Sequence, residues 1–324
     1  MKHKEIYDNL KQYLTMDKKE FDGSIKAKAF ESLMEENDGY VEVSALLALT
    51  NICKNDCAYC GLGRSNHIKR FTLKEESALE AINFVADNKI KEIFFIGGEN
   101  PAIKMETYIK YIKAAKSRGL KTNLAMGVFS KEEYKTLKDS GLDTYTIKFE
   151  ESNPTLFESY KPDISFENRM KAIHEVKESG LKLASGSIVG LKGQTLDDVI
   201  NDIKLTVDLD VEWIPIVPYL PAVGTRMAED TPAGDIDLTL RAISLLRLML
   251  PKCKITAAQP GLNKDLGFGD PEGNKKALEH GANLLFAEVT PYALKKLFSI
   301  TDHRELPRMQ QIRELVEPLG LKVR

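Results

Sequence analysis

The strongest constraint on the fold is an alternation that begins near residue 40, in which short β-type segments are each followed by a helical pattern. Eight such segments match the strand count of a (β/α)8 barrel of the TIM type. An open doubly wound sheet is the alternative, but it usually shows an early glycine-rich turn, and the chain has no G-x-G-x-x-G or Walker-type loop. We therefore expect an α/β fold, a TIM-type barrel. The predicted strands are 42–49, 92–96, 121–125, 144–149, 182–187, 213–217, 254–258 and 283–287.

Start and stop signals flank the predicted helices. Thr72 with Glu75 and Ser130 with Glu133 fit the capping box, in which a hydroxyl and a carboxylate satisfy free amides at a helix start. Thr195 with Asp198 is a looser version. Four glycines stand a few residues before a predicted strand, as left-handed residues that end a helix would. They are Gly119, Gly141, Gly180 and Gly281.

The remaining chain divides simply. Residues 1–38 combine lysine and glutamate with spaced apolar positions, which predicts an N-terminal helical extension that covers one end of the barrel. Residues 39–300 form the predicted barrel, and 301–324 form a C-terminal helix and tail with no assigned function. The formal net charge of −2 argues against nucleic acid as the main partner. No apolar run approaches the ~18 residues of a membrane span and no signal core is visible, so we expect a cytoplasmic protein without a membrane partner.

Three of the four cysteines, Cys53, Cys57 and Cys60, form a C-x3-C-x2-C segment just after the first predicted strand. Three close cysteines make a poor disulfide framework because one is always left over. A structural zinc site needs four ligands, and the nearest further candidate, His67, has the wrong spacing. Three thiolates in one loop suit three irons of a [4Fe–4S] cluster, which leaves the fourth iron free to bind a small molecule.

This segment resembles the signature of the radical S-adenosylmethionine (SAM) superfamily, C-x3-C-x-Φ-C, with Tyr59 at the aromatic position. The resemblance implies a SAM cofactor bound through its amino and carboxylate groups to the open iron. It also implies that an electron from the cluster cleaves SAM to methionine and a 5′-deoxyadenosyl radical, which acts on a small-molecule substrate in the barrel.

Other segments resemble the superfamily's SAM-binding elements. Gly97, Gly98 and Glu99 look like its GGE loop, which holds the SAM amino group. Residues 186–194 look like a G-x-I-x-G element that places Ile188 along the adenosine. Tyr219 and Leu220 match the stretch that contacts the adenine.

The fourth predicted strand fixes the direction of one carboxylate. Strand side chains alternate, so the apolar set of Tyr145, Ile147 and Phe149 suits packing on the helices. The set Thr144, Thr146, Lys148 and Glu150 then faces the lumen. Glu151 should point away as a solvated carboxylate. The resemblance gives Glu150 a SAM contact.

Arg169 follows Ser165, a predicted helix N-cap, and so lies at the same end of the barrel. There its guanidinium is placed to bind the methionyl carboxylate. Thr146 and Lys148 are predicted substrate contacts, although Lys148 equally suits a charge at the barrel mouth.

Within the superfamily the chain resembles the biotin-synthase-like branch, which includes biotin synthase, the methylornithine synthase PylB, the [FeFe]-hydrogenase maturase HydE and HmdB (HcgA). Only Cys253 remains for a second cluster, so we expect it to be a small buried residue and sulfur insertion to be absent. Four segments look most like HydE, and they are residues 60–66, 161–169, 186–195 and 237–251. However, Lys148-Phe149, Ala258-Gln259 and Thr144 stand where HydE is expected to carry Arg-His, paired threonines and arginine. HmdB usually has a longer gap between its first two cysteines.

These resemblances imply a radical SAM enzyme in hydrogenase active-site cofactor maturation, HydE-like or HmdB-like. A PylB-like amino-acid mutase and a non-catalytic iron–sulfur scaffold are the alternatives. An external electron donor such as flavodoxin or ferredoxin is the expected partner. The other histidines, His3, His174, His280 and His303, are expected to face solvent.

Overall fold

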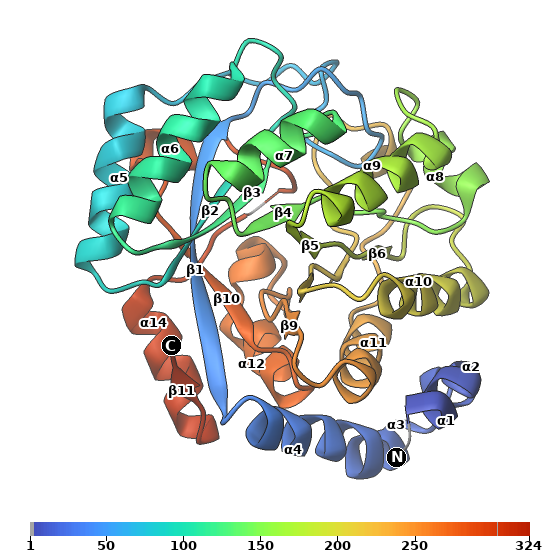
Figure 1. Cartoon of the computed structure of the whole chain (residues 1–324). Coiled ribbons are helices and arrows are strands. Elements are labelled where there is room, and N and C mark those ends of the chain that lie inside the picture. The colour runs from blue at the N-terminus through green and yellow to red at the C-terminus, as the bar shows by residue number, and fades with distance from the viewer. Residues whose placement is uncertain (1–2, 303) are drawn as a thin grey trace.

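A computed structural model describes residues 3–302 and 304–324, and its centre is a nearly closed barrel of parallel strands (Figure 1). The strand order is β10-β1-β2-β3-β4-β5-β7-β9. The seam between β9 and β10 is closed by one bridge, Thr256 to Leu284, and by the hydrogen bond from Ala257 N to Leu284 O at 2.8 Å. The expected TIM-type barrel is confirmed. The strands are β1 Tyr40–Thr50, β2 Glu92–Gly97, β3 Lys121–Ala125, β4 Thr144–Thr146, β5 Lys182–Ala184, β7 Trp213–Ile214, β9 Lys254–Ile255 and β10 Leu284–Glu288.

Helices follow the strands and form the outer layer, with their apolar faces packed on the outer surface of the barrel (Figure 1). They are α5 Glu75–Asp87, α6 Met105–Ser117, α7 Lys131–Asp139, α8 Pro154–Tyr160, α9 Phe166–Glu178, α10 Leu196–Asp208, α11 Ile236–Met249, α12 Pro271–Glu279, α13 Tyr292–Lys295 and α14 Met309–Val316, with short 3-10 turns η2 Met227–Glu229, η3 Lys264–Gly269 and η4 Glu317–Leu319. None of the described helices is long and apolar enough to span a bilayer.

The predicted strands begin where expected, but several are shorter. The fourth leaves the ladder after Thr146, and Glu150 has φ 68°, a left-handed conformation that ends extended structure. The fifth and sixth predicted strands also end early, at Ala184 and Ile214. Beyond them the chain forms a separate parallel pair, β6 Ile188–Val189 with β8 Val217–Pro218, which extends one wall of the barrel mouth. The sequence did not predict β6.

Two of the three predicted capping boxes are confirmed, at Ser130 and Thr195. The one at Thr72 is wrong. Helix α5 begins after Lys74, and the Thr72 hydroxyl lies 3.3 Å from the Thr50 hydroxyl. The four predicted helix-ending glycines all have φ between 75° and 105°.

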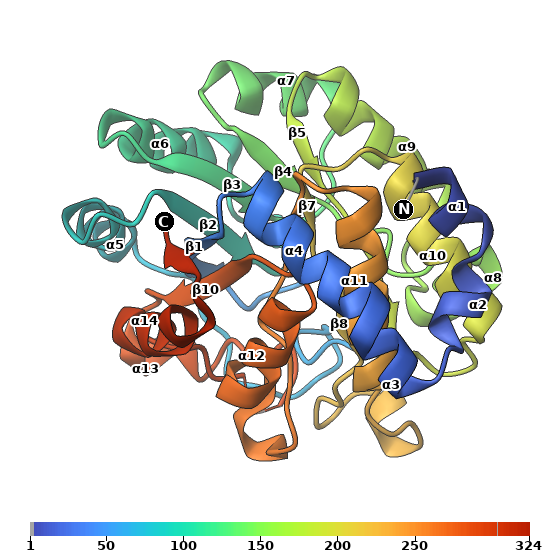
Figure 2. The same cartoon turned by 90° about the horizontal axis from the view of Figure 1, so that it is seen from below.

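The N-terminal extension crosses the end of the barrel at which the strands begin (Figure 2). It comprises α1 His3–Asp8, α2 Leu10–Leu14, α3 Lys18–Phe21, the π-helical turn η1 Asp22–Lys26 and α4 Ala27–Glu36. Arg241 of α11 fixes it, because its guanidinium donates to Met16 O at 2.6 Å and lies over the Phe21 ring. The extension therefore closes the bottom of the barrel and leaves the opposite end open.

Among the histidines, the prediction for His280 is wrong. Its ring is 3% exposed and hydrogen-bonded to the Ser244 hydroxyl at 2.8 Å, between α11 and α12. Burial and the nearby Lys26 and Lys18 lower its pKa to about 3. His3 and His174 are exposed as predicted, and His303 lies outside the described residues. Cys253 is buried, as expected, with Sγ 3.0 Å from Val211 O.

Candidate active site

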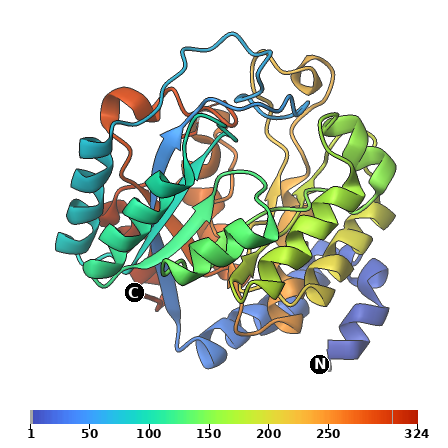
Figure 3. The ribbon, with the colours of Figure 1, turned by 45° about the horizontal axis from the view of Figure 1, so that its top comes forward.

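A cavity of about 360 Å³ opens at the end of the barrel where the strands end. The connection 51–74 between β1 and α5 arches over this end (Figure 3). The walls of the cavity come from the segments that follow β1, β2, β4, β6 and β8, and from Ile300, Thr301, Arg304 and Leu306. This is the end that carries the chemistry in TIM barrels.

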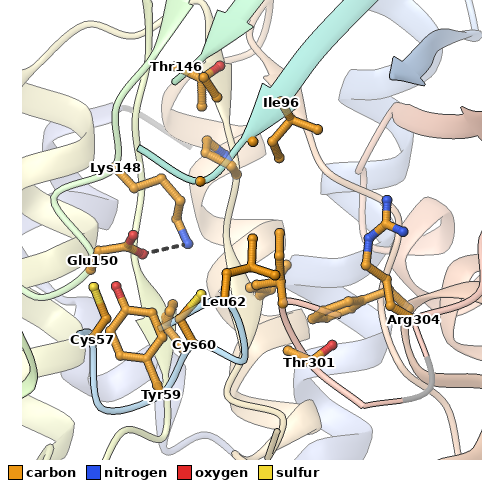
Figure 4. A pocket seen from close by; sticks show the side chains of 18 of the residues that line it. Cys57, Tyr59, Cys60, Leu62, Ile96, Thr146, Lys148, Glu150, Thr301 and Arg304 are labelled. Atoms are coloured by element: carbon orange, nitrogen blue, oxygen red, sulfur yellow. Dashed lines mark ion pairs between the residues drawn. The ribbon is translucent and has the colours of Figure 1, made fainter. Parts of the chain in front are cut away.

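Cys53, Cys57 and Cys60 are free thiols that line this cavity (Figure 4 shows Cys57 and Cys60). Arg70 holds their loop in shape, since its guanidinium donates to four backbone carbonyls. Burial raises the pKa of Cys53 and raises that of Cys60 to about 12. Metal ligands must be deprotonated, so iron that binds here displaces protons from these thiols.

The glycine pair after β2 lies directly against the cysteine loop. A Cβ on Gly98 would lie 2.3 Å from Ile52 O and 2.8 Å from Cys53 Cβ, so only glycine fits. The Glu99 carboxylate accepts a hydrogen bond from Asn55 Nδ2 at 2.8 Å and lies 2.6 Å from Lys54 Nζ. The predicted GGE loop and cysteine loop therefore form one unit.

Glu150 and Arg169 both line the cavity, as the sequence predicted. Burial opposes ionisation of Glu150, but Lys148 and Lys161 outweigh it and lower the pKa of this carboxyl. Lys148 Nζ lies 3.0 Å from Glu150 Oε2 (Figure 4). Arg169 is buried in the first turn of α9, which Ser165 caps, and its Nε has no hydrogen-bond partner in the described part of the chain.

Ile188, Tyr219 and Leu220 form the facing wall of the cavity. The β6–β8 pairing brings them together, and Tyr219 N donates to Val189 O at 2.8 Å. Tyr59 of the cysteine loop belongs to the same apolar cluster as Ile188 and Tyr219. The structure therefore brings every predicted site residue to one cavity.

The family of this chain follows from comparison with known proteins. The model of the radical SAM superfamily matches residues 47–206. The [FeFe] hydrogenase maturase subunit HydE of Thermotoga maritima is 30% identical over 292 residues, which cover 90% of this chain and 82% of that protein. The chain belongs to the radical SAM superfamily.

Other relatives of this radical SAM enzyme agree. Biotin synthase of Lawsonia intracellularis is 28% identical over 260 residues, which cover 76% of this chain and 80% of that protein. The structure of methylornithine synthase (PylB) superposes with a TM-score of 0.85 at 20% identity, covering 98% of this chain and 94% of that one. The structure of the FeFe-hydrogenase maturase HydG from Carboxydothermus hydrogenoformans superposes with a TM-score of 0.80 at 19% identity, covering 99% of this chain and 79% of that one. The two structures show the shared fold.

Superfamily membership implies a [4Fe–4S] cluster and SAM, and the residues of this radical SAM enzyme fit both. Three unbridged thiols line one cavity, and a buried guanidinium nitrogen there has no partner in the part of the chain that the structure describes. Within residues 3–302 and 304–324, no three His, Cys, Asp or Glu side chains converge on a single-ion site. Thiolates that each bind a different iron of a cluster lie farther apart than the ligands of one ion.

Sequence reasoning missed two cations of the cavity. Lys161, 7% exposed, follows α8 and donates to Cys57 Sγ and to the Tyr59 hydroxyl, both at 3.2 Å. Arg304, in the tail that was assigned no function, pairs with Glu288 of β10 at 2.9 Å (Figure 4 shows Arg304). Lys161 begins the HydE-like segment 161–169, but nothing in that segment marked its side chain as part of the cavity, and Arg304 belongs to no motif.

The prediction for Glu151 is wrong, because its side chain is fully buried. It points away from the lumen, as strand alternation required, but α10 covers that side. Glu151 Oε1 accepts from Asn153 N at 2.8 Å and Oε2 accepts from Gln194 Nε2 at 2.9 Å. Gln194 Nε2 also reaches Asp202 Oδ2 at 3.2 Å. A buried pair of carboxyl groups therefore supports the cavity wall from behind.

Proposed function

We propose that this radical SAM enzyme acts in the maturation of a hydrogenase active-site cofactor, in the manner of HydE or HmdB. The observation that carries the proposal is the 30% identity to HydE over 90% of the chain. Three thiols at the mouth of a single cavity that extends into the barrel support it. The absence of further clustered cysteines is consistent with one cluster per chain.

Each part of the cavity has a proposed role. Cys53, Cys57 and Cys60 hold a [4Fe–4S] cluster, which supplies an electron for cleavage of SAM when both are bound. Glu99 and the backbone of Gly97 and Gly98 face the SAM ammonium group, with Glu150 beside them. Arg169 offers the methionyl carboxylate its Nε–H, which has no partner among the described residues. Ile188, Tyr219 and Leu220 lie along the adenosine, with Tyr59 on the cluster side.

The remaining residues serve a small substrate. Thr146, at the end of β4, and Lys148, in the segment between β4 and Glu150, also line this cavity. Because the N-terminal extension closes the bottom of the barrel, substrate and SAM share one entrance. A cluster near that entrance suits an external electron donor such as flavodoxin or ferredoxin.

The first test is anaerobic reconstitution with iron and sulfide, followed by SAM and dithionite. We expect about four irons per chain and formation of 5′-deoxyadenosine. The matched control is the triple variant Cys53→Ala, Cys57→Ala, Cys60→Ala, which should form none. Iron binding without SAM cleavage in the presence of a hydrogenase maturation mixture would contradict the radical SAM role.

The second test addresses the pathway. A [FeFe]-hydrogenase maturation mixture from which HydE has been omitted should regain hydrogenase activity when this protein is added, and the triple cysteine variant should not restore it. SAM cleavage without any recovery of hydrogenase activity would contradict a HydE-type role. If the protein rearranges a free amino acid and does not restore hydrogenase activity, the PylB-like alternative is supported.

A further inference from the structure

Gln194, in the segment between β6 and α10, closes the turn that carries Ile188 into the cavity. Its side-chain oxygen accepts from Gly190 N at 2.6 Å, and its Nε2 donates to Ile188 O at 3.1 Å. Within the same turn, Val189 O accepts from Tyr219 N at 2.8 Å. The Gln194 side chain therefore holds in place the wall that is proposed to lie along the adenosine, although it does not itself line the cavity.

The same turn is joined to Glu150. Ile188 N donates to Glu150 O at 2.9 Å, and Glu150 N donates to Gly186 O at 3.1 Å. Glu150 has φ 68°, a left-handed conformation that a residue with a Cβ keeps only where its surroundings hold it. The main chain of residues 186–188 gives this support, so a shift of the turn at Gln194 would also move the Glu150 carboxylate.

Behind the wall, the Gln194 amide faces more acceptors than it has hydrogens. Nε2 carries two hydrogens, but it lies 2.9 Å from Glu151 Oε2, 3.1 Å from Ile188 O and 3.2 Å from Asp202 Oδ2. If both carboxyl groups are charged, the two hydrogens go to the two carboxylates, because charge-assisted hydrogen bonds are the stronger ones. The bond to Ile188 O is then lost. If one carboxyl group is protonated, one amide hydrogen remains for Ile188 O.

The surroundings of this pair of carboxyl groups favour a retained proton. Glu151 is 0% and Asp202 1% exposed. The charges that act on them most strongly are negative, from Asp198 on Glu151 and from Glu151 on Asp202. Tyr160 of α8 also faces the pair, and burial raises the pKa of its hydroxyl, so it stays neutral. Burial, and then these charges, raise the pKa of both carboxyl groups.

We propose that Gln194 is a positioning residue for SAM, and that it holds Ile188 and Glu150 in place only while Glu151 and Asp202 keep one proton between them. The inference rests on the proposed function only in taking Ile188 and Glu150 as SAM contacts. It predicts that the affinity for SAM falls as the pH rises, although neither Glu151 nor Asp202 lines the cavity.

Equilibrium dialysis of the reconstituted protein with SAM, without reductant, tests the positioning role. Gln194→Met keeps the length of the side chain and removes its hydrogen bonds, so we expect the dissociation constant for SAM to rise about tenfold at about pH 7. Gln310→Met makes the same change at an exposed position of α14 and should bind SAM as the wild type does. An unchanged dissociation constant in Gln194→Met would overturn the positioning role.

The pH profile of SAM binding tests the shared proton. Between about pH 6 and about pH 8.5, we expect the dissociation constant of the wild type to rise more steeply than that of Asp202→Asn, because asparagine is neutral throughout. Every other titrating group is common to the two proteins, so the difference belongs to Asp202. Asp139→Asn, at an exposed ion pair, should follow the wild type. Profiles of equal slope in the wild type and Asp202→Asn would overturn the shared proton.

Hydrogen exchange of the cofactor-free chain tests the turn without SAM. Gly190 N–H loses its acceptor in Gln194→Met, so the peptide that contains it should exchange about tenfold faster, while the amides of α5 keep their wild-type rates. Unchanged protection of Gly190 would also overturn the positioning role, and this measurement stands even if the variant binds too little SAM to measure.

The outcomes separate this inference from the proposed function. A wild type that binds SAM with the expected dependence on Gln194, but forms no 5′-deoxyadenosine after reduction, would keep the inference and lose the radical SAM role. A wild type that forms 5′-deoxyadenosine, with equal SAM affinity in Gln194→Met, would keep that role and lose the inference.

Discussion

Lys161 is a buried lysine whose ammonium group donates to Cys57 Sγ and to the Tyr59 hydroxyl. It also contributes to the lowered pKa of Glu150. A positive charge next to a cysteine ligand stabilises the more negative, reduced form of a cluster, because hydrogen bonds to the sulfurs and net charge set the potential. Lys161 therefore influences the reduction potential of a bound cluster through its contact with Cys57, without touching the substrate.

Lys161→Met should make the reduction potential of the reconstituted cluster more negative. At a fixed ambient potential we expect the ratio of reduced to oxidised cluster to fall about tenfold, which is 59 mV for a one-electron couple. A redox titration followed by electron paramagnetic resonance measures this. Lys192→Met is the matched control, and an unchanged potential in Lys161→Met would rule out this role.

His280 predicts a pH dependence of stability. Its pKa is about 3 in the folded chain and about 6.5 when unfolded. The unfolded chain therefore takes up the proton first, so this contribution is complete above about pH 6.5 and is lost as the pH falls toward 3. We expect the free energy of unfolding to fall by about 1.4 kcal/mol per pH unit in this window.

Urea unfolding of wild type and His280→Gln over this range measures the His280 contribution. The free energy of unfolding should change less steeply with pH in His280→Gln than in the wild type. His174→Gln changes an exposed histidine and should keep the wild-type slope. Equal slopes for wild type and His280→Gln would contradict the buried, neutral state.

At the scale of elements, Gln194 joins the segment after β6 to α10 and to the end of the fourth strand. Its side chain accepts from Gly190 N at 2.6 Å and donates to Ile188 O, Glu151 Oε2 and Asp202 Oδ2. Burial raises the pKa of Glu151, and burial together with the Glu151 carboxylate raises that of Asp202. This wall of the cavity therefore contains two carboxyl groups whose charged forms are disfavoured by burial.

Asp202→Asn should stabilise the protein increasingly as the pH rises. A carboxyl whose folded pKa lies above its unfolded value contributes stability at low pH that is lost as the pH rises through the folded pKa. Asparagine keeps an oxygen for Ser152 N, which Asp202 Oδ1 binds at 2.7 Å, and carries no charge. Unfolding free energies between about pH 5 and pH 8 test this. Asp139→Asn, at an exposed ion pair, should show no such trend.

Local patterns predicted element starts and faces better than element lengths. The alternation of strand four correctly buried Tyr145, Ile147 and Phe149 in the core. It could not show that the ladder ends at Thr146, because pairing depends on strands distant in sequence. The same alternation correctly predicted that the Glu151 side chain points away from the lumen. It could not predict that this side chain is buried, because the burial depends on the position of α10. Thr72 likewise had the residue types of a cap, while its hydroxyl lies against Thr50 instead.

The residues of the candidate site fall into those that the sequence predicted and those that it missed. The cysteines, the glycine pair, Glu150 and Arg169 were found because each lies in a short motif at a strand or helix end. Lys161 and Arg304 reach the cavity through packing, and Arg304 comes from a segment far along the chain. The direction of a side chain that is set only by tertiary contacts leaves no periodic or motif signal.

At the scale of the molecule, the segment after α13 closes the cavity. Ile300, Thr301, Arg304 and Leu306 line it, and Ile300 O accepts from Gly61 N of the cysteine loop at 2.9 Å. The Arg304–Glu288 pair fastens this segment to β10, with side chains 7% and 9% exposed. One buried ion pair thus joins the C-terminal region to the barrel.

Arg304→Met should destabilise the protein by roughly 3 kcal/mol, because it leaves the Glu288 carboxylate buried without a partner. Adding Glu288→Gln should restore most of that loss. Urea unfolding of the two single variants and the double variant measures the coupling. Lys131→Met, at the exposed pair with Glu178, should change stability by less than about 1 kcal/mol. A double variant no more stable than Arg304→Met would contradict the pairing.

The strand that leads into the cysteine loop completes its pairing late. β1 pairs with β10 along one edge, and along the other edge with β11 Lys322–Val323 and then with β2. A ribosome delivers β10 and β11 long after the cysteine loop, so until then a nascent chain holds its three thiols beside a strand that lacks two of its three neighbours. Iron and sulfide therefore enter a finished site only after these two strands have been made. Until that point, cluster loading competes with oxidation and degradation of the incomplete barrel.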